Sequence, residues 1–403
     1  MSPPPLPLEE AQARLLGLAP GLPVEQRAVA DCAGYWLAEP LTAVRTQPAR
    51  AMSAMDGYAV RNGEAGPWRV AGESAAGRPF SGTLAAGEAV RISTGAVMPE
   101  GTDCVLLQED CDRDGERLIH REPPPTAGKH VRRAGLDFVD GDELLAAGTR
   151  IGAAQIGLVL AAGHTHLPVR RAVRLALLDC GDELAPPGVP GEAHRLPASN
   201  AAMLAALVAG LPVETRRAGP VADDLDALTA ALEAAADADI VVTTGGASVG
   251  EHDLIRPALE RLGAELAFWR VAVRPGKPLL VARRAGANGS QVILGLPGNP
   301  ASAYVTGYLF LLPLLRATLG AATPLPRPLA ARLGAPLGPG GKRTEFLRAR
   351  WADGVVTSAP QQDSGALRPL AHANALIRRE IAAPPAAIGE AVQVYWLENG
   401  GIA

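Results

Sequence analysis

Features that would point to a particular partner or compartment are scarce in this sequence. Aromatic residues make up only 4% of the 403 residues, so Ala, Val and Leu must build most of the core. Basic and acidic residues number 38 and 42, a balance that argues against a nucleic-acid or anionic-membrane protein. The most apolar run, LFLLPLL near residue 312, is far too short to span a bilayer.

Cysteine patterns that signal disulfides or metal fingers are also missing. Cys32, Cys104, Cys111 and Cys180 show no CxxC spacing and no disulfide-like pattern, which is typical of a reducing compartment. The N-terminal stretch MSPPPLPLEEAQARLL has no basic start followed by an apolar stretch, so no signal peptide is visible. We therefore expect a cytoplasmic protein that has neither a nucleic-acid nor a membrane partner.

The chain is too long for one ordinary domain, and the spacing of its apolar residues changes along its length. Apolar residues at helical spacing predict helices over residues 1–45, including an apolar-rich stretch at 24–41, and again over residues 143–170. Between them, residues 46–142 contain short β-like runs separated by Gly, Pro and Asp clusters. The sequence thus predicts a small β domain inserted into a helical domain.

From residue 171 onward, strands and helices alternate along the chain. Aliphatic runs such as AVRLALLD and DADIVVTT are followed by segments with helical periodicity. This alternation predicts a three-layer, mainly parallel α/β domain over residues 171–320. After a Pro-rich linker, TPLPRPLA, short strands predict a separate β module over residues 321–403.

Three loops rich in glycine and polar residues follow strands of this α/β domain: CGDEL at 180–184, TTGGASVGEHD at 243–253 and GLPGNPAS at 295–302. Because ligands of open parallel sheets sit outside the carboxyl ends of the strands, the loops should open onto one edge. Gly245 and Gly246 would let backbone N–H groups approach an anion, and a following helix adds its positive end. We expect a phosphate or another oxyanion there; for a lone Gly-Gly pair, a tight turn is the alternative.

Two common nucleotide-binding signatures are absent. RPGKP at 274–278 is not a Walker loop because Pro follows the Lys, and no GxGxxG opens a helix. Arg270, Arg274 and Lys277 nevertheless bring three cations together. On a strand, residues 270 and 274 share a face, so both could meet one polyanion. An exposed edge strand with solvated charges is an equally good interpretation.

Four acidic residues, Asp56, Glu183, Asp223 and Asp253, are candidates for the same site. Carboxylates repel phosphates unless a hard divalent cation bridges the two, so Mg2+ is the natural inference. Simpler roles compete with this one. Asp253 and either Asp223 or Asp224 could cap helices, and Asp56 could occupy a hairpin turn in MDGYA.

The ordered set of these segments resembles the molybdopterin molybdenumtransferase family, which includes MoeA and the E domain of gephyrin. MDGYA together with STGAVMP is the most specific part of the likeness. The matching stretches run along nearly the whole chain: SAMDGYAV at 53–60, RISTGAVMPEGTDCV at 91–105, GDEL at 181–184, SN at 199–200, TTGGASVGEHD at 243–253, FWRVAVRPGKP at 268–278, LGLPGNPASA at 294–303 and, more loosely, SGALRPLAHANALI at 364–377.

The resemblance implies an elongated helical dimerisation domain (residues 1–45 and 143–170), an inserted β domain (46–142), an α/β molybdopterin-binding domain and a C-terminal β-barrel. It implies a homodimer whose active site lies between the α/β domain of one subunit and the β domain of the other. The implied reaction inserts molybdate into adenylylated molybdopterin and releases AMP, with Mg2+ or Zn2+ assisting cleavage of the phosphoanhydride. Candidate partners are the molybdopterin-adenylylating enzyme and molybdoenzymes.

Carried over position by position, the resemblance assigns roles to residues of this chain. The implied catalytic residues are Asp56, Thr94, Glu183, Asp223 and Asp253, of which Asp56, Glu183 and Asp253 would hold the metal. The implied substrate-binding residues are Gly245, Gly246, Ser248, Gly250, Arg270, Arg274, Lys277, Pro297, Gly298, Asn299, Pro300 and Ser364.

The sequence departs from the family pattern at three positions of the predicted site, and two other functions are alternatives. Arg270 and Arg274 replace common lysines and keep the charge, whereas Cys180 replaces a Thr or Ser and loses a hydroxyl hydrogen bond. One rival is a molybdopterin adenylyltransferase, built on the same α/β domain but lacking the MDGYA segment and the C-terminal module. The other is a catalytically silent scaffold of the gephyrin kind.

Overall fold

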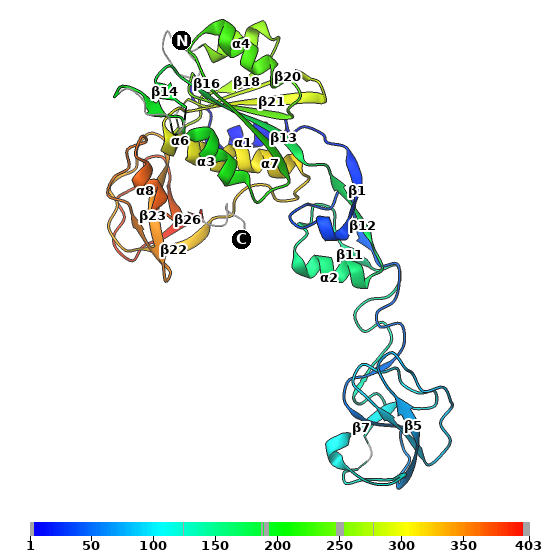
Figure 1. The fold of residues 1–403 in the computed structure, drawn as a ribbon. Coiled ribbons are helices and arrows are strands. Elements are labelled where there is room, and N and C mark those ends of the chain that lie inside the picture. The colour runs from blue at the N-terminus through cyan, green and yellow to red at the C-terminus, as the bar shows by residue number, and fades with distance from the viewer. Residues whose placement is uncertain are drawn as a thin grey trace.

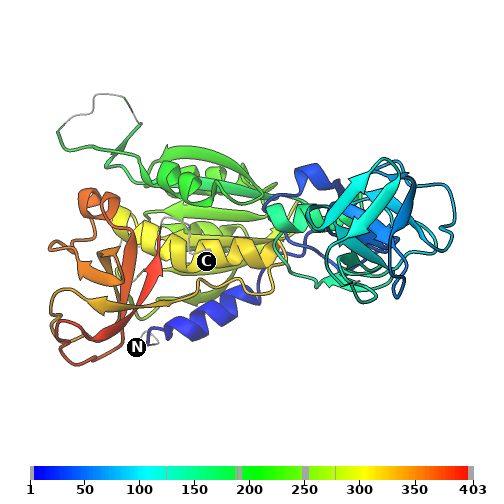
Figure 2. The same cartoon turned by 90° about the horizontal axis from the view of Figure 1, so that it is seen from below.

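The computed structural model describes residues 4–123, 125–186, 188, 193–246, 254–276 and 278–397. The molecule is elongated: an α/β unit and a β-barrel lie at one end, a small β unit lies at the other, and a slender middle region joins them (Figure 1, Figure 2). None of the described helices is long and apolar enough to cross a membrane.

Six strands form the sheet of the α/β unit. In spatial order they are β16 (Val213–Val221), β13 (Val173–Cys180), β17 (Ile240–Thr244), β21 (Gly289–Leu296), β20 (Leu280–Gly286) and β18 (Glu265–Trp269). The first four pair in parallel, and β20 runs antiparallel to both neighbours. The predicted mainly parallel α/β fold is therefore confirmed.

Helices pack on both faces of this sheet and complete three layers (Figure 1). One face is covered by α1 (Leu8–Leu16), α3 (Asn200–Val208), α6 (Pro300–Thr306) and α7 (Leu312–Thr318), and the other by α4 (Leu225–Glu233) and α5 (Ile255–Arg261). Strand β17 shows why both layers form. Ile240 and Val242 are buried in the first cluster and Val241 in the second, as the period of two in a strand requires.

The helix from Pro300 to Thr318 is continuous but changes its winding in the middle. Between α6 and α7, Gly307–Leu311 form a π-helix. A π-turn disturbs the i→i−4 ladder, so its carbonyl groups need other partners. The carbonyl oxygen of Leu309 accepts a hydrogen bond from Nε2 of Gln12, at 2.9 Å. Gln12 is buried, so this contact fixes α1 against the α6–α7 helix.

The helical prediction for residues 24–45 is wrong. β1 (Val24–Ala28) pairs antiparallel with β12 (His166–Arg170), and β2 (Leu41–Thr42) pairs with β11 (Glu143–Leu145). Gly34 and Pro40 interrupt this stretch, which disfavours a long helix. Its apolar residues instead build a small core with α2 (Ala153–Ala161); the buried members of that core are Val29, Cys32, Leu37, Leu41, Ile151, Val159, Leu167 and Val169.

The predicted helical domain is wrong in a second way. Residues 143–170 contain one α-helix, α2, between strands β11 and β12. The first helix of the chain, α1, packs in the core of the α/β unit through Leu8, Ala11 and Leu15. The middle region therefore contains both strands and a helix, and the N-terminal helix α1 belongs to the α/β unit instead.

Two all-β units complete the molecule. The remote one is a sheet in the order β7 (Cys104–Leu107), β4 (Gly57–Val60), β6 (Glu88–Ile92), β5 (Trp68–Ser74), β9 (Arg117–His120) and β8 (Cys111–Asp114). The C-terminal one closes into the predicted barrel, because β23 pairs with β25 as well as β24. Its strands are β22 (Leu329–Leu333), β23 (Thr344–Ala352), β24 (Val355–Ser358), β25 (Ala375–Arg379) and β26 (Ala391–Trp396).

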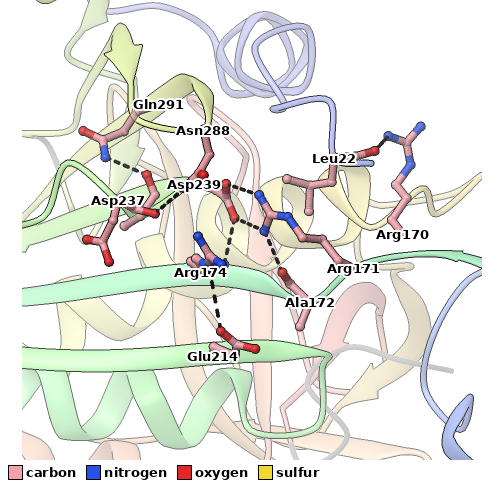
Figure 3. A network of polar contacts seen from close by, with 11 residues as sticks. Leu22, Arg170, Arg171, Ala172, Arg174, Glu214, Asp237, Asp239, Asn288 and Gln291 are labelled. Atoms are coloured by element: carbon pink, nitrogen blue, oxygen red, sulfur yellow. Dashed lines mark hydrogen bonds and ion pairs between the residues drawn. The ribbon is translucent and has the colours of Figure 1, made fainter. Parts of the chain in front are cut away.

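A buried ion pair between Arg171 and Asp239 joins the segment just before β13 to the residue just before β17 (Figure 3). Arg171 donates to both carboxylate oxygens of Asp239, at 2.7 and 2.8 Å, and the backbone N–H of Arg174 donates to the same carboxylate at 2.8 Å. The Asp239 side chain is only 3% exposed. Asp237, two residues earlier, forms a pair with Arg216 in which both side chains are more than half exposed.

These two pairs predict very different costs for the same substitution. Asp239→Asn should lower the free energy of unfolding by about 3 kcal/mol, because it leaves the guanidinium of Arg171 without its counter-charge. Asp237→Asn, the control, should cost less than about 0.5 kcal/mol, because water screens that pair. Urea unfolding followed by circular dichroism measures both, and equal costs would contradict the structural role of Asp239.

Candidate functional site

A cavity of about 800 Å³ opens at the carboxyl edge of the α/β sheet, beside the barrel. Its walls come from the loops after β13, β17 and β21, the start of α3, residues 274–276 and 278, and a barrel loop at 362–365. Nine residues that the sequence singled out line it together: Glu183, Gly245, Gly246, Arg274, Pro297, Gly298, Asn299, Pro300 and Ser364. The three glycine-rich loops thus meet at one edge, as their positions after parallel strands predict.

Glycine is required in these loops because their backbones touch. Gly245 has φ 90°, and a Cβ atom on it would lie 2.2 Å from the carbonyl oxygen of Cys180. A Cβ on Gly298 would lie 3.3 Å from the Cα of Gly245. A side chain is therefore excluded at Gly245, and one at Gly298 would be tightly packed, so backbone forms much of the cavity wall here.

A carboxylate that the sequence reasoning missed holds these loops in place. Asp179, the penultimate residue of β13, is 5% exposed. Its Oδ1 accepts hydrogen bonds from the hydroxyl of Thr244, at 2.7 Å, and from the backbone N–H of Ala201, at 3.0 Å. One buried oxygen therefore ties the ends of two strands to the start of α3. An acidic residue closing the apolar strand AVRLALLD was the signal that could have revealed it.

The barrel closes the cavity from the opposite side. Ser364 lies on the loop before α8 (Leu367–Ala371), and its Oγ accepts a hydrogen bond from Nδ2 of Asn299 at 2.9 Å. The carbonyl oxygen of Ser364 accepts another from the backbone N–H of Ala301, also at 2.9 Å. Arg343, Gln362 and Asp363 add polar side chains to this wall. Sequence reasoning missed all three because their strands and loops carry no motif.

The predicted pair of cations on one strand face is wrong. β18 ends at Trp269, and Arg270 adopts φ 67°, so residues 270 and 274 do not share a continuous strand. The guanidinium of Arg270 stacks on the ring of Trp269, 3.9 Å from its centroid, and Arg270 does not line the cavity. Arg274 does line it, and its Nη1 lies 2.8 Å from Oε1 of Glu345.

Asp223 does not cap a helix. Asp224 caps α4, since its side chain accepts hydrogen bonds from the backbone N–H groups of Asp226 and Ala227. The backbone N–H of Asp223 donates to Oδ1 of Asp182 at 3.1 Å, which holds it beside the GDEL loop. Asp223 lies near that loop and outside the residues that line the cavity.

Cys180 is a packing residue. Its side chain is buried in the apolar cluster between the sheet and the helices α4 and α5. Burial raises the pKa of the Cys180 thiol to about 12, so the sulfur stays protonated at neutral pH. A protonated, buried thiol is a poor nucleophile, and the cavity therefore has no covalent catalyst at this position.

Asp56 and Thr94 lie together on the remote β unit, just before β4 and just after β6. Oδ1 of Asp56 accepts a hydrogen bond from the backbone N–H of Thr94 at 2.6 Å. This bond lowers the pKa of the fully exposed Asp56 carboxyl, which keeps it ionised at neutral pH. Next to it, a Cβ on Gly57 would lie 1.8 Å from the carbonyl oxygen of Leu106, so MDGYA needs its glycine.

Two of the predicted metal ligands, Asp56 and Glu183, lie on different units of the chain. In the part of the chain that the structure describes, no three His, Cys, Asp or Glu side chains could hold a metal ion together. Glu183 lines the cavity, whereas Asp56 belongs to the remote β unit. Asp253, together with the predicted substrate-binding residues Ser248, Gly250 and Lys277, lies outside the described residues.

Family models match three consecutive segments of the chain. Residues 6–163 match the MoeA N-terminal region (domain I and II), residues 176–317 a probable molybdopterin binding domain, and residues 330–397 the MoeA C-terminal region (domain IV). These segments correspond to the middle and β units with α1, to the α/β unit, and to the barrel.

Curated relatives and solved structures agree with this division. The molybdopterin molybdenumtransferase of Haemophilus influenzae is 33% identical over 77% of each chain, and that of Bacillus subtilis is 32% identical over 93% of this chain and 90% of its own. The crystal structure of a molybdopterin biosynthesis MoeA protein from Pyrococcus horikoshii superposes with a TM-score of 0.81, at 27% identity, over 98% of this chain and 99% of its own. The chain therefore belongs to the molybdopterin molybdenumtransferase family, that of MoeA.

Proposed function

We propose that this chain acts in molybdenum cofactor biosynthesis, as the enzyme that takes adenylylated molybdopterin and molybdate, inserts the metal into the dithiolene and releases AMP. The observation that carries this is the cavity, in which glycine-rich backbone, the start of α6 and the side chains of Arg274 and Arg343 surround one space. The relatives reported above bear the name of this activity.

The chemistry of the cavity suits a substrate with several negative charges. Backbone N–H groups of glycine-rich loops and guanidinium groups stabilise phosphates and tetraoxoanions. Cleavage of a phosphoanhydride depends mainly on neutralising charge and orienting the reactants, which needs no covalent nucleophile. Asn299 and Ser364 join the α/β unit to the barrel across this space, so both walls would hold the substrate still.

We infer that two chains supply the carboxylates of a divalent-cation site here. Carboxylate oxygens are the ligands that Mg2+ prefers, and Glu183 at the cavity and the ionised Asp56 both offer them. A bound Mg2+ or Zn2+ would neutralise charge on the anhydride. Because Asp56 lies on the remote β unit, we infer that it reaches the cavity of a second copy of the chain.

An exposed apolar surface in the middle region supports such a dimer. Val44 is 56% exposed, Leu160 51% and Val139 45%. Val44 and Val139 follow Ala43 and Phe138 in the chain, and these two belong with Ala162 to a small buried cluster. Helix α2, which carries Leu160, buries only Val159 among its nine residues. Exposed apolar side chains gathered beside one small cluster favour an interface there, and this region lies between the two units that would have to cooperate.

The reaction itself can be followed by AMP release. Purified protein given adenylylated molybdopterin, Mg2+ and molybdate should release AMP, and omitting molybdate should abolish the release. Absence of molybdate-dependent AMP release would refute the proposed insertion. Consumption of ATP with release of pyrophosphate from unmodified molybdopterin would instead identify an adenylyltransferase.

The contribution of two chains to one site predicts complementation. Asp56→Ala and Glu183→Ala homodimers should each be inactive while remaining folded. After the two are mixed and exchanged at equal amounts, about a quarter of the wild-type rate should return, since half of the dimers are mixed and each has one intact site. Continued inactivity of the mixture would mean that Asp56 and Glu183 serve the same chain's site.

The apolar surface predicts where the dimer can be broken. Leu160→Arg should shift the sedimentation of the protein toward the monomer and lower activity with it, because a charge must be desolvated in the interface. Leu266→Arg is the matched control, since Leu266 is 45% exposed on β18, away from the middle region. If both variants sediment as the wild type does, the surface around α2 is not the interface.

A further inference from the structure

Two buried side chains at the floor of the cavity carry oxygen atoms without partners. Asp179 and Asn200 are only 5% and 7% exposed, and both line the cavity. The two hydrogen bonds that Asp179 receives both go to Oδ1, and among the described residues Oδ2 receives none. Asn200 uses Nδ2 to donate to the carbonyl oxygen of Gly298 at 2.7 Å, and its Oδ1 is buried and has no partner in the described part of the chain.

The surrounding bonds fix which atoms remain available. Thr244 and Ala201 hold Oδ1 of Asp179, and Gly298 holds the amide nitrogen of Asn200, so neither side chain can turn away without losing a buried hydrogen bond. Both remaining atoms are acceptors. Oδ1 of Asn200 is buried, and a buried acceptor without a donor is costly. A ligand that supplies N–H groups here therefore gains more than one that does not.

The cavity is therefore polarised. The floor, at the end of β13 and the start of α3, offers acceptors and a carboxylate, which repel a phosphate or a molybdate. Arg274, which also contacts Glu345, and Arg343 line the same cavity from other elements of the chain and attract such anions. A ligand that fits both parts has neighbouring N–H donors at one end and negative charge at the other.

We propose that Asp179 and Asn200 form an acceptor subsite for the pterin end of the substrate, receiving its ring N–H and the adjacent amino group. This inference rests on the proposed function and adds the orientation of the substrate, with the pterin on the floor and the charged end toward the arginines. Two acceptors match the two adjacent donors of a pterin. The Watson–Crick edge of adenine offers a donor beside an acceptor, and an oxyanion offers no donor, so neither matches this floor.

Two small ligands that differ at one position test the subsite without any turnover. Pterin-6-carboxylate carries the ring N–H and the amino group, whereas lumazine-6-carboxylate carries a carbonyl oxygen in place of the amino group. In a fluorescence titration the wild-type protein should bind the pterin at least about tenfold more tightly, because the carbonyl places an acceptor against an acceptor. Equal affinity for the two ligands would overturn the proposal.

Asp179→Asn should reverse this preference. An Asn side chain keeps an acceptor for Thr244 and Ala201 but places an amino group where Oδ2 was, so the lumazine carbonyl would find a donor. The matched control is Asp363→Asn, which removes the same charge from the barrel side of the same cavity and should leave the pterin preference intact. Circular dichroism checks that both variants remain folded.

The remaining outcomes are equally decisive. If Asp179→Asn leaves the pterin preference unchanged, the subsite is overturned. If calorimetry in addition shows that this substitution abolishes Mg2+ binding, Asp179 is a metal ligand instead. Preference for the pterin that Asp179→Asn reverses supports it even if the wild-type protein releases no AMP, in which case the proposed reaction fails and the subsite stands.

Discussion

The approach of three loop backbones at the carboxyl edge of the sheet is the constraint on which the site depends. Gly245 lies so close to the carbonyl of Cys180 that no side chain fits between them, and the loop of Gly298 packs against Gly245 in turn. Asp179 holds this arrangement from below through Thr244 and the start of α3. The cavity is consequently built of backbone on one side and of side chains from the barrel on the other.

The sequence predicted those parts of the fold that rest on periodicity. Alternating apolar strands and helices predicted the α/β sheet, and glycine-rich loops after its strands predicted the edge where the cavity opens. The same method failed for residues 24–45, because their apolar side chains are shared among β1, β2 and α2 in a core that long-range pairing assembles. Local spacing cannot reveal a pairing between strands more than a hundred residues apart.

The site was predictable where residues occur in a motif and not where tertiary geometry decides. Arg270 shows this well: its positive φ turns the chain out of β18 and its guanidinium rests on Trp269, which no count of residues along a strand could anticipate. Asp179 looked like part of an apolar strand, and its function follows from partners far away in the sequence. Arg343 and Gln362 come from the barrel, whose position against α6 is likewise a tertiary property.

The contact between Gln12 and the π-helix has a topological consequence. Since α1 is fastened inside the α/β unit, the chain enters that unit, leaves it through β1, and returns through β12, which pairs with β1. The middle and β units are thus a long insertion into the α/β unit, and the two-stranded ribbon of β1 and β12 connects them to it. A protease cut in the β unit would leave both fragments anchored in the same core. The orientation of the β unit relative to the α/β unit depends on the conformation of this ribbon.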